Sequence, residues 1–133
     1  MQNVFFNLED KWVKKAKHYI AFYNFKHVEE KPLSFSALIR EALREYTKDG
    51  LNISDILENN KLQSSYRVCR VRLTEEDAKE LERAKLLFRN KGLNISSGAL
   101  IRASLKSFLE KRTCHLYKDL KASNFLKLNL MKC

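Results

Sequence analysis

Hydrophobic and polar residues alternate from Tyr66 to Leu73, a pattern typical of a β-strand with one buried face. The stretch has an apolar face formed by Cys69, Val71 and Leu73, and an opposite, mainly cationic face formed by Val68, Arg70 and Arg72. Because the apolar face should pack against a core, we expect the two arginines to point into solvent.

Two amphipathic helices are predicted after this strand. Thr74 can cap the first, with a carboxylate three residues later, and Gly92 can end it in a left-handed conformation. Ser96 or Ser97 can cap the second helix, which we expect to end near Arg112. The expected core positions of these helices are Ala78, Leu81, Ala84, Leu87, Phe88, Leu100, Ile101, Leu105, Phe108 and Leu109.

The N-terminal half repeats this order of elements. Residues 4–8 alternate like a short strand, Glu9 and Asp10 begin a helix, Pro32 interrupts the chain, and Ser34 can cap a second helix. The sequence Ala-Leu-Ile-Arg at residues 37–40 recurs at residues 99–102, an offset of 99 − 37 = 62, whereas the strands repeat at 73 − 8 = 65. We assign the extra residues of the first copy to the loop between its helices, where an insertion costs little. Residues 50–54 also match residues 92–96, which we interpret as a helix stop and cap used twice.

The repeat divides the chain into four segments. Residues 1–48 form a first, divergent unit, 49–65 a polar connector with one helical turn near 54–57, 66–112 a second unit, and 113–133 a basic C-terminal extension. The connector is long enough to bring the two strands side by side in one antiparallel ribbon. The expected fold is therefore mainly α-helical with a short two-stranded antiparallel ribbon. For the extension we favour a third helix packed on the core over an oligomer contact or a disordered tail.

A strand followed by two helices, with Gly92–Ser96 between the helices and Ala99–Arg102 opening the second, resembles the ribbon-helix-helix family of DNA-binding proteins. The resemblance implies that two units pair their strands and insert the ribbon into the DNA major groove. Two units in one chain would form a pseudo-dimer, similar to plasmid-transfer accessory proteins with tandem units. The DNA-contacting face would then be asymmetric, and a symmetric operator is no longer implied.

Alternation selects the residues expected to face the bases: Arg70, Arg72, Thr74, Phe5 and Asn7, with Asn3 or Glu9 at the margins. Arginine suits guanine, asparagine suits adenine, and Phe5 could contact a thymine methyl group. The alternative for the two arginines is a solvated strand face that discourages aggregation. A register shift of one residue in the first strand would instead turn Phe5 inward and Phe6 outward.

Phosphate contacts are implied at the N-termini of the two second helices. The amides in question belong to Ser34, Phe35, Ser36, Ser96, Ser97 and Gly98. The serines at 34 and 96 would cap their helices whether or not DNA binds. We expect Arg40, Arg44, Arg102 and Lys106 to be ordinary charges on the helix surface.

Composition favours a polyanionic partner. The 133 residues include 26 Lys plus Arg against 16 Asp plus Glu, a formal net charge of +10, which points to nucleic acid or a membrane surface. No apolar run approaches the roughly 20 residues of a membrane helix, and the first residues lack the features of a secretory signal. We therefore expect a cytoplasmic protein without a membrane partner. Three widely spaced cysteines and three isolated histidines predict reduced thiols and no metal site.

No catalytic signature is recognisable, so we expect a binding protein, not an enzyme, with no cofactor and no small-molecule substrate. The predicted function is sequence-specific binding of double-stranded DNA, as a transcriptional regulator or an accessory protein of a plasmid or viral replicon, with scope for further self-association on DNA. The alternative is a protein-interaction module of the antitoxin type, whose basic tail holds an acidic partner and whose DNA binding is secondary.

Overall fold

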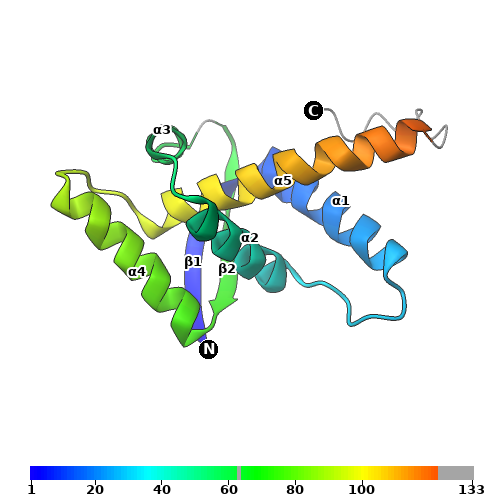
Figure 1. Cartoon of the computed structure of the whole chain (residues 1–133), viewed down its shortest axis with the longest axis horizontal. Coiled ribbons are helices and arrows are strands. Elements are labelled where there is room, and N and C mark those ends of the chain that lie inside the picture. Colours follow the sequence, from blue (N-terminus) through cyan, green and yellow to red (C-terminus); the bar gives the residue numbers. More distant parts are fainter. Residues whose placement is uncertain (63, 123–133) are drawn as a thin grey trace.

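Two strand–helix–helix units follow one another along the chain (Figure 1). The first comprises β1 (Gln2–Glu9), α1 (Asp10–Lys26) and α2 (Phe35–Asp49), and the second comprises β2 (Tyr66–Leu73), α4 (Glu75–Asn90) and α5 (Ser97–Ala122). A short helix, α3 (Ile53–Glu58), lies in the connector. The computed structural model describes residues 1–62 and 64–122, with side chains as far as Arg112. The predicted fold class and the predicted order of elements are confirmed.

The two strands of this one chain pair with each other in an antiparallel ribbon. Gln2 lies opposite Leu73, and Glu9 lies opposite Tyr66. The inner face of the ribbon contributes Phe6, Leu8, Val71 and Leu73 to the core, with Val4 and Cys69 packed against it. Phe5 is 65% exposed whereas Phe6 is buried, which confirms the first of the two registers considered for β1.

An approximate two-fold relation connects the two strands through the pair Phe5 and Arg70. These residues lie directly opposite each other in the ladder. They are also separated by the offset at which the strands repeat, 70 − 5 = 65. Residues on one side of this pair therefore correspond to residues on the other side, and the approximate axis passes between Phe5 and Arg70.

Each second helix packs along the strand of the other unit, α2 beside β2 and α5 beside β1. Arg40 Nη1 in α2 donates to the carbonyl oxygen of Arg72 at 2.7 Å. Arg102 Nη1 in α5 donates to the carbonyl oxygen of Asn7 at 3.0 Å. The arginines are related by 102 − 40 = 62 and the acceptors by 72 − 7 = 65, so the two hydrogen bonds are equivalent under the repeat. The offsets deduced from the sequence are thus reproduced in the contacts.

One continuous core joins the units, and α2 and α5 cross at its centre (Figure 1). Most of the predicted core positions are buried, including Leu81, Leu100 and Leu105. Leu87 was predicted to lie in the core, but this prediction is wrong because its side chain is 53% exposed. It lies about 120° around the helix axis from Leu81, outside the face that α4 presents to the core.

Hydrogen-bonding side chains begin the helices at the predicted caps. Ser34 Oγ accepts from the amide of Ala37, Thr74 Oγ1 from that of Asp77, and Ser96 Oγ from that of Ala99. These bonds satisfy amides that the first turn of a helix leaves without an acceptor.

The ends of the elements depart from the prediction at α5. The helix does not stop near Arg112 but continues to Ala122, since neither glycine nor proline occurs between residues 110 and 122 to end it. Residues 113–122, assigned to the extension, therefore prolong α5 without a break. Residues 123–133 lie outside the described residues. The predicted helical turn in the connector is present as α3. Within the described ranges, no helix has the length and apolar character required to cross a membrane.

Candidate nucleic-acid interface

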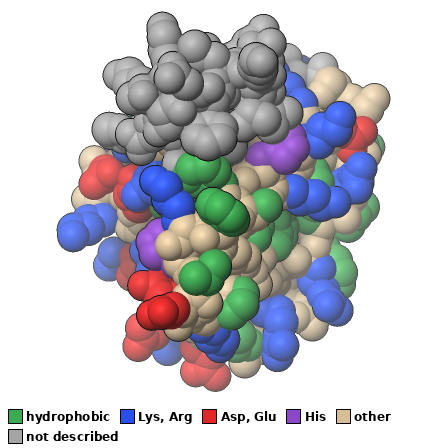
Figure 2. All heavy atoms as spheres, turned by 90° about the vertical axis from the view of Figure 1, so that its right-hand side faces the viewer, with side chains coloured by type: hydrophobic (Ala, Val, Ile, Leu, Met, Phe, Trp, Pro, Cys, Tyr) green, Lys and Arg blue, Asp and Glu red, His purple; other side chains and the backbone are tan. Residues whose placement is uncertain are grey.

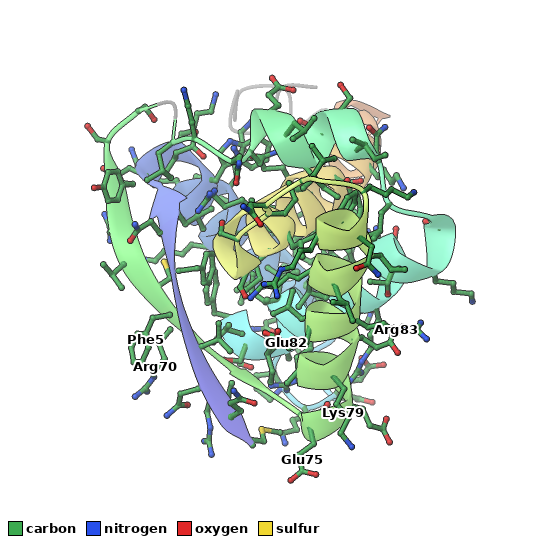
Figure 3. The ribbon with its side chains drawn as sticks, turned by 90° about the vertical axis from the view of Figure 1, so that its left-hand side faces the viewer. Phe5, Arg70, Glu75, Lys79, Glu82 and Arg83 are labelled. Atoms are coloured by element: carbon green, nitrogen blue, oxygen red, sulfur yellow. The ribbon has the colours of Figure 1, made fainter. Side chains whose placement is uncertain are left out.

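The outer face of the ribbon presents three opposed pairs to solvent: Asn3 with Arg72, Phe5 with Arg70, and Asn7 with Val68. Figure 3 shows Phe5 and Arg70 extending together from the ribbon, on the side away from the helices. Arg70 and Arg72 are exposed, and Val68 is 66% exposed. The structure therefore brings four of the five predicted base-contacting residues, Phe5, Asn7, Arg70 and Arg72, onto one surface.

The fifth predicted base reader, Thr74, has its hydroxyl engaged elsewhere. Thr74 Oγ1 accepts from the amide of Asp77 at 3.1 Å and donates to Asp77 Oδ2 at 2.8 Å. Glu9, a marginal candidate, is not on the exposed face at all. Its carboxylate is buried and accepts a 2.7 Å hydrogen bond from Lys106 Nζ. Burial of an unpaired carboxylate would be costly, which explains why the end of β1 turns this side chain toward the lysine.

The outer edges of the ribbon are held by the second helices. The backbone amide of Arg72 donates to Ser36 Oγ at 3.0 Å, and its carbonyl accepts from Arg40. On the other edge the carbonyl of Asn7 accepts from Arg102. A free-standing two-stranded ribbon would be only marginally stable. Here its backbone is anchored on both sides, which fixes the positions of the outward-pointing side chains.

The predicted phosphate-contacting amides lie beside these anchored edges. The hydroxyls of Ser34 and Ser96 are used as caps. The amides of Phe35, Ser36, Ser97 and Gly98 belong to first helical turns, which supply no intrahelical acceptors. Both helix N-termini, with their N–H groups and the positive ends of the helix dipoles, therefore lie beside the ribbon.

Gly98 occupies the position equivalent to Ser36, since 98 − 36 = 62. A Cβ atom at Gly98 would lie 2.9 Å from Arg102 Nη1 and 3.6 Å from Phe6 Cβ. The absence of a side chain therefore leaves room for the Arg102 guanidinium to reach β1. Sequence reasoning did not identify this role, although the unequal residues at two aligned positions marked a local difference.

Arg102 was predicted to be an ordinary charge on the helix surface, but this prediction is wrong. It is 5% exposed, and in addition to the bond to Asn7 it donates from Nη2 and Nε to the carbonyl of Asn59 at 2.6 and 3.1 Å. Burial lowers the pKa of this guanidinium and the nearby carboxylate of Glu9 raises it, with a net decrease. Its donors thus join the connector, α5 and β1. The equivalent Arg40 is only half-buried.

Two ion pairs cross between the units in the same manner. Arg44 binds both oxygens of Asp77, at 3.0 and 2.9 Å, and Lys106 binds Glu9. The basic residues are related by 106 − 44 = 62, and each acid lies at the start of the other unit's first helix. Burial alone would raise the pKa of Asp77, but hydrogen bonds from Arg44 and Thr74 outweigh it and lower the pKa below its ordinary value. Lys106, whose side chain is 14% exposed, and Arg44 therefore connect the units instead of serving as unattached surface charges.

Apolar side chains are also exposed away from the ribbon. Near the C-terminal end of α1, Phe25 and Val28 are exposed. Figure 2 views this side and shows hydrophobic side chains lying among Lys and Arg side chains.

In the described part of the chain, no group of three or more His, Cys, Asp and Glu side chains is arranged to hold a metal ion.

Comparison of the chain with models of protein families, with curated proteins and with solved structures gave no match.

Proposed function

We propose that this chain is a DNA-binding protein of the ribbon-helix-helix type, with both units of the pseudo-dimer in one polypeptide, and that the outer face of the β1–β2 ribbon enters the major groove. The observation that carries the proposal is the exposed pair of arginines, Arg70 and Arg72, on a two-stranded ribbon whose edges are anchored by α2 and α5. The major groove is wide enough for such a ribbon.

The chemistry of the exposed face suits base recognition. An arginine can donate two hydrogen bonds to O6 and N7 of guanine, and an asparagine can pair with N6 and N7 of adenine. Arg70, Arg72, Asn3 and Asn7 supply these groups from adjacent positions. Each good contact of this kind contributes about 1–3 kcal/mol of discrimination, so the face is suited to a short recognition site.

The helix N-termini would supply the contacts that fix the ribbon in the groove. First-turn amides of α2 and α5 are suited to bind phosphates on either side of it, and the net charge of +10 favours association with DNA in general. A transcriptional regulator and an accessory protein of a plasmid or viral replicon both use such an interface, and we propose a role of this class.

The test is selection of duplexes from a random pool on the full chain, followed by titration of the selected duplex at several salt concentrations. We expect the pool to converge on a short motif and log K to fall by about 0.9 per phosphate neutralised as log salt rises. A pool that does not converge, together with binding that is insensitive to salt, would refute the proposal.

One observation favours the second candidate, a protein-interaction module. The exposed Phe25 lies at the end of α1 and the exposed Val28 in the turn that follows it, both outside the ribbon strands. Exposed apolar residues that cluster can mark protein contacts. Salt-insensitive capture of a protein partner, lost on replacement of Phe25 and Val28 by serine and unaffected at Arg72, would support this alternative.

A further inference from the structure

We infer that the ribbon recognises a non-palindromic site, in which Phe5 at the centre and Val68 in one half contact thymine methyl groups, while Asn3 and Arg72 bind hydrogen-bonding base edges in the other half. The inference rests on the proposed function and specifies the ligand chemistry of the same face. It adds Val68, which the sequence placed on the exposed side but did not mark as a base reader.

Phe5 and Arg70 form the pair at the approximate axis. In a ribbon built from two identical chains, a residue on the axis faces its own copy. Here Phe5 faces Arg70. The centre of the recognition face therefore has an aromatic ring on one side of the axis and a guanidinium on the other.

The pairs Asn3–Arg72 and Asn7–Val68 lie on either side of this central pair. The two-fold relation exchanges Asn3 with Val68 and Asn7 with Arg72, since 68 − 3 and 72 − 7 both equal 65. One end of the ribbon therefore carries an amide opposite a guanidinium, and the other end carries an amide opposite an isopropyl group. None of the three equivalent positions on the exposed face keeps the same residue in both copies.

Val68 lies near Phe5 on the exposed face of the ribbon. Val68 is two residues before Arg70, the partner of Phe5, so the two apolar side chains are diagonal neighbours. Diagonal neighbours on one face are about 7–8 Å apart, close to two base steps of about 3.4 Å along a strand. The pair can therefore reach methyl groups on nearby bases, one at the centre of the site and one in the half beside Val68.

The group of DNA that suits contact with Phe5 and Val68 is the thymine methyl group. In unmodified DNA the thymine C5-methyl is the apolar group on the floor of the major groove. Phe5 and Val68 are 65% and 66% exposed, yet Arg70 and Arg72 adjoin them. The one acid at an alternating position of β1, Glu9, turns its carboxylate inward to Lys106. An apolar pair beside arginines therefore matches DNA, whose backbone phosphates are anionic and whose major groove carries thymine methyl groups.

The experiment replaces thymine by deoxyuridine, one position at a time, in the duplex selected on the full chain. This change removes the methyl group and leaves the hydrogen-bonding groups in place. We expect a loss of affinity of about four-fold for each methyl contacted, as burial of one carbon predicts, at positions confined to the centre and one half of the site. Phe5→Ala and Val68→Thr should bind the thymine duplex more weakly and should each lose discrimination at one position.

Arg72→Ala is the matched control, because it should weaken binding while leaving the ratio of thymine to uracil affinities unchanged. Duplexes built from two copies of either half should bind less tightly than the selected site. Equal affinity for thymine and uracil duplexes at every position would overturn this inference while leaving the proposed DNA binding intact. Failure of any duplex to be selected would overturn both.

Discussion

Arg102 spans three segments of the chain, with Nη1 on the carbonyl of Asn7 at 3.0 Å and two further donors on the carbonyl of Asn59. Asn59 lies in the connector, at the end of α3. The same side chain therefore anchors one edge of the ribbon and holds the connector against α5. Its counterpart Arg40 anchors the other edge without a comparable cover.

Replacement of Arg102 by alanine should destabilise the fold more than replacement of Arg40 by alanine. Loss of Arg102 leaves the buried carbonyl of Asn59 and the partly buried carbonyl of Asn7 without their donor, at a cost of about 3 kcal/mol in the free energy of unfolding. Loss of Arg40 exposes one carbonyl to water and should cost about 1 kcal/mol or less. Urea unfolding of both variants measures the difference. Equal losses would show that burial by the connector adds nothing.

The ion pair of Arg44 with Asp77 should make the free energy of unfolding decrease at acidic pH. Because the folded pKa of Asp77 is lowered, its contribution is present at neutral pH and is lost as the pH falls through the folded pKa. Asp77→Asn should therefore reduce the free energy of unfolding by about 1 kcal/mol at pH 7, a modest figure because Arg44 is largely exposed. The difference from the parent chain should shrink as the pH is lowered from about 5 toward 2.

Glu80→Gln is the control for this experiment. Glu80 pairs with Arg83 on the exposed side of α4, and such pairs contribute only about 0.2–0.5 kcal/mol. The comparison is made by urea unfolding across the pH series. A deficit in Asp77→Asn that stays constant down to pH 2 would contradict the assignment.

Arg70→Ala and Arg72→Ala should impair sequence recognition more than general DNA affinity. Each should cost about 1–3 kcal/mol on the selected site and much less on random duplex, because base contacts carry specificity and phosphate contacts mostly do not. Arg83→Ala removes the same charge from α4, away from Phe5 and Arg70 (Figure 3), and should affect both duplexes slightly and equally. Competition titrations at one fixed salt concentration measure these losses. Equal losses on both duplexes for Arg72→Ala would exclude a base contact.

The ribbon should be closed within each molecule in solution. Phe6 lies opposite Cys69 in the ladder, at a separation that a disulfide can bridge in antiparallel pairs. Phe6→Cys, in a chain with Cys114 and Cys133 replaced by serine, should therefore oxidise to an internally cross-linked monomer. Burial raises the pKa of the Cys69 thiol, and neighbouring Arg67 offsets this only in part. The thiolate fraction at pH 7 is reduced, so cross-linking should accelerate at higher pH.

Mass spectrometry and non-reducing electrophoresis at low protein concentration distinguish the products. Leu57→Cys in the same background is the control, because Leu57 is exposed on α3 and is not opposite Cys69. A covalent dimer as the main product of Phe6→Cys would indicate that strands pair between chains.

Period-two alternation predicted which strand residues are buried, except at Glu9. Val71, Leu73 and Phe6 are inward and Arg70, Arg72 and Phe5 outward because the neighbouring core leaves each strand only one apolar side. The repeat of Ala-Leu-Ile-Arg was similarly informative, since equal helices crossing at one place need the same small and branched residues. These signals depend on local periodicity, which is visible in a linear sequence.

Long-range contacts were not visible in this way. Arg40 and Arg102 occupy equivalent positions in the sequence, and nothing in the connector indicated that Asn59 would cover only the second. Glu9 has the alternation of an exposed residue, but its environment is decided by Lys106, 97 positions away. Leu87 satisfied a helical spacing but lies at the edge of the stripe, where the neighbouring helices decide burial.

Closure of the ribbon within one chain changes how its population responds to dilution. A ribbon assembled from two molecules forms in a second-order step and dissociates when the protein falls below its dimerisation constant. In this chain the connector between α2 and β2 keeps the second strand at a high effective concentration near the first. The binding-competent fraction is then independent of copy number, and occupancy of a single target should rise hyperbolically with protein concentration, without the threshold that dimerisation imposes.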